Sequence, residues 1–83
     1  MSTANKMQWG TISLYKPGWY KPEPSETYRV SAGHALRMAA QDVEALGVGA
    51  YAWVDTPERS QRIECNHEGR AVIMYQGGPE DAA

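Results

Sequence analysis

An apolar stripe at helical spacing between residues 31 and 47 constrains the fold of this chain more than any other feature. Its members recur at intervals of three and four residues, as one face of an α-helix requires: Ala32, Ala35, Leu36, Ala39, Ala40, Val43 and Leu46. Ser31 is a favourable N-cap, and Gly47 stands where a glycine often ends a helix. We therefore predict a helix over 32–46, and its many alanines allow it to lie close against a sheet.

The segments before and after this helix alternate with a period of two, which is typical of β-strands. These segments are Met7–Tyr15, Glu26–Val30, Val48–Asp55, Gln61–Cys65 and Arg70–Tyr75. The last three are joined by short turns, so we expect them to form an antiparallel meander. The pattern predicts an α+β fold of two layers, with one helix packed on a mainly antiparallel sheet in the order β-β-α-β-β-β. Residues 1–83 form a single domain, with 1–6 and 77–83 as loose ends.

The small size of the chain limits the functions that it can carry. A chain of 83 residues buries roughly 63% of its surface on folding, which makes one modest core. A ligand pocket of about 300 Å³ would take a large share of that core. With ten acidic and eight basic residues the net charge is −2, which disfavours general binding to duplex DNA. We therefore expect the function to reside on the surface.

Cysteine usage and the N-terminal segment predict the compartment. Cys65 is the only cysteine and cannot form an internal disulfide, whereas small secreted domains usually depend on disulfides. The first six residues lack the apolar stretch of a signal peptide, and no apolar run approaches the length of a membrane span. We expect a cytoplasmic protein without a membrane segment.

Catalytic and metal chemistry have little support in the sequence. Cys65 and His67 offer two soft ligands where a structural zinc site needs four. Cys65 with His34 or His67 and an acid can form a triad only in space, because no glycine-rich elbow or predicted helix N-terminus adjoins the thiol. We predict no catalytic residue, no metal and no cofactor, and interpret Cys65 as a small buried hydrophobe. An enzyme that uses Cys65 and a histidine is the third and least favoured hypothesis.

The segment 15–22 mixes aromatic side chains, lysines and prolines. Proline stiffening lowers the entropy lost on binding, and tryptophan and tyrosine dominate binding hot spots. Three interpretations stand side by side. Trp19 and Tyr20 can fold back as a lid over the open face of the sheet, or they can bind a protein. Alternatively, Lys16, Trp19, Tyr20 and Lys21 can bind single-stranded nucleic acid by stacking and charge.

Four acidic residues make a second candidate surface. Asp42 and Glu44 lie near the end of the predicted helix, and Asp55 and Glu58 flank the loop after the following strand. If that strand lies beside the helix, some of these carboxylates share one end of the domain. Such a patch can occupy a basic, nucleic-acid-binding surface of another protein by charge complementarity. The alternative is an ordinary solvated surface, which the interspersed arginines favour.

The stretch from Glu26 to Ala32, followed by the alanine-rich helix to Leu46, resembles segments of small inhibitors encoded by phages and other mobile elements, among them anti-CRISPR proteins. The resemblance covers about a quarter of the chain. It implies binding to a CRISPR surveillance complex of a bacterial host and blockade of target DNA recognition or of nuclease recruitment. The class shares no motif, so it assigns no residue a role.

Two leading hypotheses follow from these observations. The first is a non-enzymatic, protein-binding inhibitor, a monomer or homodimer, with an anti-CRISPR protein as its sharpest form. Its candidate partner-binding residues are Asp42, Glu44, Asp55, Glu58, Trp19 and Tyr20. The second is a single-stranded nucleic-acid-binding module that uses the loop at 15–22.

Overall fold

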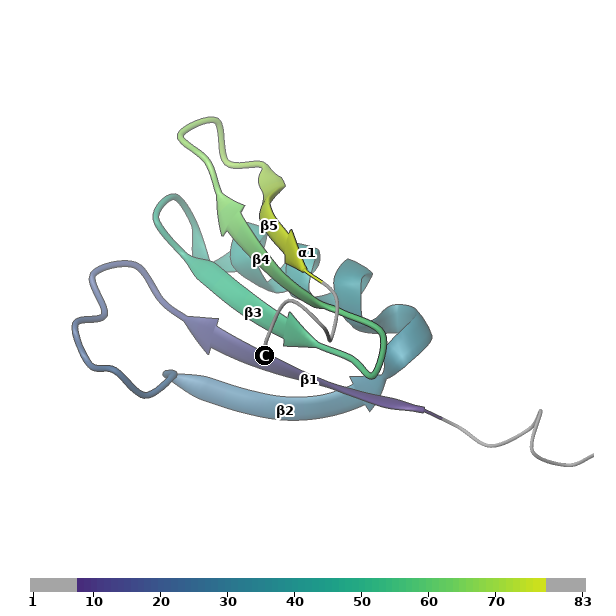
Figure 1. Ribbon diagram of the computed structural model, residues 1–83. Helices are drawn as coiled ribbons and strands as arrows, with labels where there is room; N and C mark the ends of the chain where they lie inside the picture. Colours follow the sequence, from purple (N-terminus) through teal and green to yellow (C-terminus); the bar gives the residue numbers. More distant parts are fainter. Residues whose placement is uncertain (1–7, 78–83) are drawn as a thin grey trace, which may run out of the picture.

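The computed structural model describes residues 8–77 of the chain. A five-stranded antiparallel sheet forms one layer and a single α-helix lies behind it, so the predicted α+β architecture is confirmed (Figure 1). The elements are, in chain order, β1 (Trp9–Tyr15), β2 (Glu26–Ser31), the 3₁₀ turn η2 (Ala32–His34), α1 (Ala35–Leu46), β3 (Tyr51–Asp55), β4 (Ser60–Cys65) and β5 (Ala71–Gly77).

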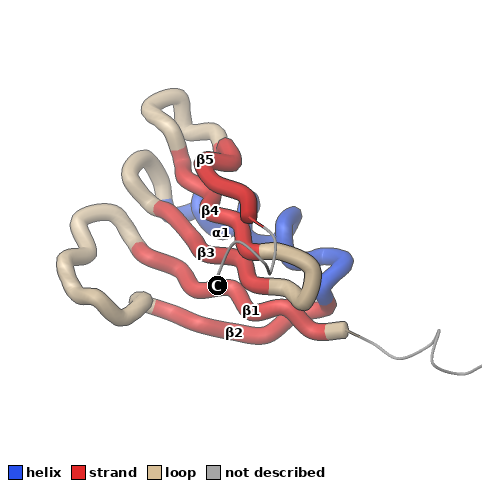
Figure 2. The backbone as a smooth tube through the Cα atoms, in the orientation of Figure 1, coloured by secondary structure: helices blue, strands red, loops and turns tan. Residues whose placement is uncertain are grey.

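The strands lie in the order β2-β1-β3-β4-β5, and every neighbouring pair is antiparallel. The chain makes the hairpin β1–β2, crosses behind the sheet as α1, and returns with β3 on the free side of β1 (Figure 2). The meander β3-β4-β5 then completes the sheet, as predicted. Because β1 pairs on both sides, Ile12 lies opposite Tyr28 on β2 and Val54 on β3.

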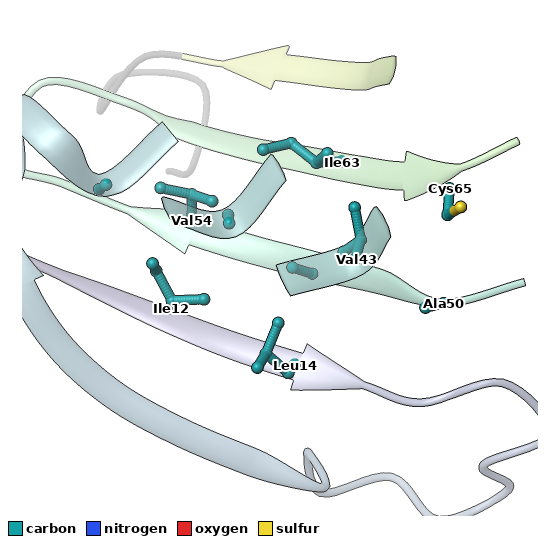
Figure 3. Packing of buried hydrophobic residues seen from close by; sticks show 10 residues of the cluster. Ile12, Leu14, Val43, Ala50, Val54, Ile63 and Cys65 are labelled. Carbon is teal, nitrogen blue, oxygen red and sulfur yellow. The ribbon is translucent and has the colours of Figure 1, made fainter. Parts of the chain in front are cut away.

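The core lies between α1 and the sheet and consists of small and aliphatic side chains (Figure 3). Its buried members include Ile12, Leu14, Val43, Ala52, Val54 and Ile63. Ala35 and Ala39 are fully buried and let the helix backbone approach the strands. The approach is tight at Gly10, where a Cβ would lie 3.3 Å from the Cβ of Ala35 and 3.2 Å from the carbonyl oxygen of Asp55.

The start of the helix differs from the prediction. Ser31 is the last residue of β2 and makes no side-chain capping hydrogen bond, residues 32–34 form a 3₁₀ turn, and α1 begins at Ala35. The backbone N–H of Ala32 donates to the carbonyl of Gln8, so the β1–β2 ladder continues where the helix was expected to begin. The buried stripe is also narrower than predicted, because Leu36 and Leu46 are 37% and 40% exposed.

The strand after the helix also begins later than predicted. Gly47 and Gly49 have φ values of +103° and +96°, so residues 47–50 form a turn and β3 begins at Tyr51. At the other terminus Gly77 is the last residue of β5 rather than part of a loose end. The remaining residues predicted as loose ends, together with Met7 of the first predicted strand, lie outside the described residues.

Candidate functional site

Aromatic side chains gather on the side of the sheet opposite α1. Side chains alternate between the two faces of a strand, so the neighbours of core residues point to this side. Four aromatic residues and one arginine from four strands form a cluster that we call the aromatic face. Its members are Tyr15 (β1), Tyr51 and Trp53 (β3), Arg62 (β4) and Tyr75 (β5). Within residues 8–77 no helix lies on this side, and all five side chains are partly exposed.

The centre of the aromatic face is a stack of three groups. The rings of Tyr15 and Tyr51 lie parallel, with centroids 4.5 Å apart and an interplanar angle of 4°. The Cζ atom of Arg62 lies 4.0 Å from the ring centroid of Tyr51. Because β3 stands between β1 and β4, Tyr15 and Arg62 approach Tyr51 from opposite sides. Both faces of the Tyr51 ring are therefore covered.

Trp53 and Tyr75 extend this cluster toward β5. Their rings meet edge to face at 5.8 Å and 65°, across Arg62, which is the β-sheet partner of both residues. Tyr75 packs over Gly77, where a Cβ would lie 3.0 Å from the Cζ atom of the tyrosine ring. Because Gly77 has no side chain, the Tyr75 ring can occupy the space above it.

The charges on this side of the sheet balance. The Nε of Arg62 lies 2.7 Å from a carboxylate oxygen of Glu64, so the cation in the aromatic cluster has its own counter-ion. At the far end of β1 and β2 the guanidinium of Arg29 lies 5.0 Å from the ring centroid of Trp9. Asp55 accepts a hydrogen bond of 2.6 Å from Ser60. Among the strand residues on this side, the two arginines, Arg29 and Arg62, are balanced in number by two carboxylates, Asp55 and Glu64.

The loop that the sequence singled out lies between β1 and β2 and extends past the ends of these strands (Figure 1). The Nε1 of Trp19 donates a hydrogen bond of 2.7 Å to the carbonyl of Glu23. The Nζ atoms of Lys16 and Lys21 lie 4.8 and 5.2 Å from the Trp19 ring centroid. Trp19 thus packs within its own loop. Tyr20 is 94% exposed, so it does not act as a lid over the sheet.

The four acidic residues do not form one patch. Asp42 accepts a hydrogen bond from the hydroxyl of Tyr28 on β2, whereas Glu44 accepts one from the backbone N–H of Ala71 on β5. These carboxylates lie on opposite flanks of α1. We expected some of the four acids to share one end of the domain, and the placement of β3 shows which of them do.

The end of β3 lies beside the start of α1, not beside its end. At Gly10 the side chain of Ala35 and the carbonyl of Asp55 approach the same point. Asp42 is seven residues further along the helix than Ala35, which is about 10 Å along its axis. Asp55 and Glu58 therefore lie at one end of the domain, and Asp42 and Glu44 toward the other.

The contact between Tyr28 and Asp42 changes the chemistry of the tyrosine. Burial, the hydrogen bond to Asp42 and the negative charges of Asp42 and Glu26 all raise the pKa of Tyr28 well above its usual value. Burial makes the largest contribution. Each of these effects disfavours the phenolate, so Tyr28 stays protonated and continues to donate to Asp42 in mildly alkaline solution.

The candidate catalytic residues are not assembled. Cys65 is buried, with 4% of its surface exposed, as expected for a small core hydrophobe. His67 lies exposed in the turn between β4 and β5, and His34 lies in η2 at the other end of the domain. In the part of the chain that the structure describes, no three His, Cys, Asp or Glu side chains are placed to hold a metal ion.

We compared the chain with protein-family models, curated proteins and solved structures, and found no match in any of the three. Among the described residues, no helix is long and apolar enough to cross a membrane. The site must therefore be interpreted from its own geometry. Sequence reasoning missed the aromatic face, although Tyr51 and Trp53 carried a signal: two large rings alternate with the small core residues of one strand.

Proposed function

We propose that this protein is a non-enzymatic protein-binding module that docks on its partner through the aromatic face. The observation that carries the proposal is the packed stack of Tyr15, Tyr51 and Arg62. Tryptophan, tyrosine and arginine are the residues most enriched in binding hot spots. Here they are held by one another before any partner arrives, so little side-chain entropy is lost on binding.

The alternative partner, single-stranded nucleic acid, fits this surface less well. Sequence-tolerant binding of single strands requires aromatic ring faces free for bases and a positively charged groove for phosphates. Both faces of Tyr51 are occupied, and the two arginines on this side of the sheet are balanced by Asp55 and Glu64. In the loop, two lysines already lie against the Trp19 ring. These contacts favour a protein partner with an apolar, nearly neutral surface.

An interface of ordinary size would extend beyond the aromatic face to the flanking strands. A standard interface removes about 800 Å² from each partner, or roughly 20–30 residues. The aromatic face spans β1, β3, β4 and β5, and the exposed Tyr20 projects from the adjoining loop. The aromatic cluster forms the centre of such an interface, and the polar residues of the flanking strands form its rim.

The resemblance to anti-CRISPR proteins supports a more specific prediction, that the bound partner is a CRISPR effector and that binding inhibits it. The measurement is target DNA binding by purified effector complexes with and without this protein. If the wild-type protein reduces DNA binding and Trp53→Ala does not, the aromatic face is the surface that contacts the effector. Unchanged DNA binding with every effector leaves a protein partner of another class.

The experiment on the face itself compares two variants. Wild-type protein, Trp53→Ala and the control Leu46→Ala are immobilised, and each captures proteins from a bacterial lysate for identification by mass spectrometry. Leu46 is exposed on α1, away from the aromatic face, so its truncation matches the loss of apolar surface. The affinity of each captured protein is then measured with purified components.

We expect Trp53→Ala to weaken the specific complex by about 2 kcal/mol, roughly 30-fold, and Leu46→Ala to leave it unchanged. Equal binding by wild type and Trp53→Ala contradicts the proposal. A second measurement titrates the tryptophan fluorescence with single-stranded oligonucleotides. Quenching that reverses as salt rises would instead support the nucleic-acid hypothesis.

A further inference from the structure

The two edges of the sheet are built differently. β2 and β5 are the outer strands, and each has a row of backbone groups directed away from the sheet. Unpaired edges of this kind accept strands from other chains unless something blocks them. The two edges therefore show where a further strand can and cannot add.

The β5 edge is blocked. The N–H of Asn66 donates to the carbonyl of Arg70, so these two residues bond to each other across the β4–β5 hairpin. Because bonding alternates along an antiparallel pair, the N–H of Ala71 points outward. A carboxylate oxygen of Glu44 on α1 accepts that N–H at 2.9 Å. A register shift between Arg62 and Ile63 then interrupts the pairing and the regular spacing along β5.

Among residues 8–77, no side chain accepts an outward N–H group of β2, and no register shift interrupts its pairing. The N–H of Ala32 donates to the carbonyl of Gln8, which marks these two residues as a hydrogen-bonded pair. The same alternation directs the N–H and C=O groups of Thr27 and Arg29 away from β1. The register runs unbroken from Trp9 opposite Ser31 to Leu14 opposite Glu26. β2 also contains no proline and no glycine.

We propose that β2 pairs antiparallel with β2 of a second copy of this chain, which joins the two sheets edge to edge. In the register that we propose, Tyr28 lies on the two-fold axis and Thr27 lies opposite Arg29 of the second copy. Thr27 and Arg29 are the residues whose backbone groups point outward, so each of the two symmetric pairs exchanges two hydrogen bonds. No residue of β2 needs to change its backbone conformation.

The charges of β2 fit this register. Arg29 meets a threonine, and Glu26 meets Val30 of the second copy, so no charged residue faces its own copy directly. The guanidinium of Arg29 is already directed toward Trp9 of its own chain, 5.0 Å from the ring centroid. A shift by two residues would place the two Arg29 side chains opposite each other, and like charges directly opposite are destabilising.

Apolar burial favours a second copy as the occupant of this edge. On the helix side of β2, Tyr28 and Val30 are only partly buried at the margin of the core. α1 packs mainly against β1, β3, β4 and β5 and reaches β2 through the hydrogen bond from Tyr28 to Asp42, and Tyr28 and Val30 stay partly exposed. In the proposed dimer the two Tyr28 residues are direct neighbours on the axis, and Val30 lies beside them. Each copy thus places its Tyr28 and Val30 against the same two residues of the other copy.

The first experiment removes one donor from the edge. Arg29→Pro eliminates an outward N–H, and proline is tolerated on an edge strand when its nitrogen faces solvent. Arg29→Ala is the matched control because it loses the same side chain and keeps the N–H. Light scattering after size-exclusion chromatography should show a dimer for wild type and Arg29→Ala, and a monomer for Arg29→Pro. Circular dichroism and thermal melting confirm that each variant is folded.

A wild-type monomer, or a folded Arg29→Pro dimer, overturns the proposal. A second experiment tests the register if Arg29→Pro fails to fold. Facing residues of a hydrogen-bonded pair have Cα atoms about 5.5 Å apart, within the range of a disulfide. Thr27→Cys mixed with Arg29→Cys should therefore form a mixed disulfide on oxidation, whereas Arg29→Cys alone should not.

Efficient cross-linking of Arg29→Cys with itself, or none in the mixture, contradicts the proposed register. Cys65 is buried, which shields it from the oxidant, and wild-type protein oxidised in parallel controls for it. Arg29 is not part of the aromatic face, so loss of the dimer and loss of partner binding are separate results. Failure of the dimer proposal leaves the proposed function intact.

Discussion

The two sides of the sheet use the same strands for different purposes. On β3, Ala52 and Val54 point toward α1 and are 0% and 1% exposed, whereas Tyr51 and Trp53 point away and are half-buried. The larger side chains are thus on the side without a helix. This is the reverse of a fold that places its largest apolar groups in the core.

The close approach of α1 explains this distribution. Ala35 and Ala39 bring the helix backbone near the strands, and the space that remains accepts only aliphatic side chains. On the side opposite α1, no helix within residues 8–77 restricts the size of the side chains. The aromatic rings there pack against one another. Most of the buried core lies on one side of the sheet, the proposed recognition surface lies on the other, and the following substitutions test that division.

The largest effect is expected from a core truncation. Ile63 is 1% exposed beneath α1, so Ile63→Ala should lower the free energy of unfolding by about 2–5 kcal/mol through lost burial and a new cavity. Urea denaturation gives the value. The corresponding loss for Trp53→Ala on the open side should be smaller. A larger loss for Trp53→Ala would show that the aromatic face, rather than the helix-covered side, holds the fold together.

Enlarging the helix stripe should cost somewhat less. Ala39 is fully buried against the sheet, and Ala39→Leu forces the helix away from it, at a cost of about 1–3 kcal/mol. Ala40→Leu is the matched control, because Ala40 lies at the margin of the contact and is partly exposed. Thermal melting should separate the two variants. Equal melting temperatures would mean that the alanines do not set the spacing of the layers.

Removal of the ring of Tyr75 probes the open side alone. The edge-to-face contact with Trp53 predicts that Tyr75→Ala lowers the free energy of unfolding by about 0.5–1.5 kcal/mol beyond the loss of buried area. We expect its effect on partner affinity to exceed its effect on stability. The comparison is made by measuring both quantities on the same preparation. A stability loss as large as that of Ile63→Ala would contradict the division of roles.

The smallest effect is expected at the flank of the helix and appears only in alkaline solution. The pKa of Tyr28 is raised in the folded protein, so above about pH 10 the unfolded chain loses the phenolic proton first. The stability that this group contributes is complete below that pH and decreases progressively as pH rises from there toward the raised pKa of the folded state. The difference in melting temperature between wild type and Tyr28→Phe, measured from pH 8 to 11, should be constant up to about pH 10 and start to narrow above it. A difference in melting temperature that stays constant over this pH range would show that ionisation of Tyr28 does not affect stability.

Much of the fold followed from local patterns. Alternation in residues 9–15 and 51–55 identified which side chains share a face, and the stripe of Ala35, Ala39 and Val43 identified the helix surface that packs on the sheet. The order of the strands in the sheet could not be predicted in this way, because no local pattern indicates that β3 pairs with β1. Tyr15 and Tyr51 become neighbours only through that pairing, so the stack was not predictable from either segment.

The division of the four acids into two pairs follows from an order of elements that the sequence did contain. A strand that follows a helix through a short turn runs back along it, so the end of the helix adjoins the start of the strand. Glu44 and Asp55, each near the end of its element, therefore lie far apart. The helix start was less predictable, because the bond from Ala32 to Gln8 depends on the pairing of β1 with β2.

The alternation of the two sides along each strand has an evolutionary consequence. Core and surface residues occupy adjacent positions, as Ala52 and Trp53 do, yet a substitution at one reaches only its own side of the sheet. Successive generations can therefore exchange the aromatic residues one at a time while the layer beneath α1 keeps the fold. The exposed half of each strand can therefore vary at a smaller cost in stability than the half that packs under α1.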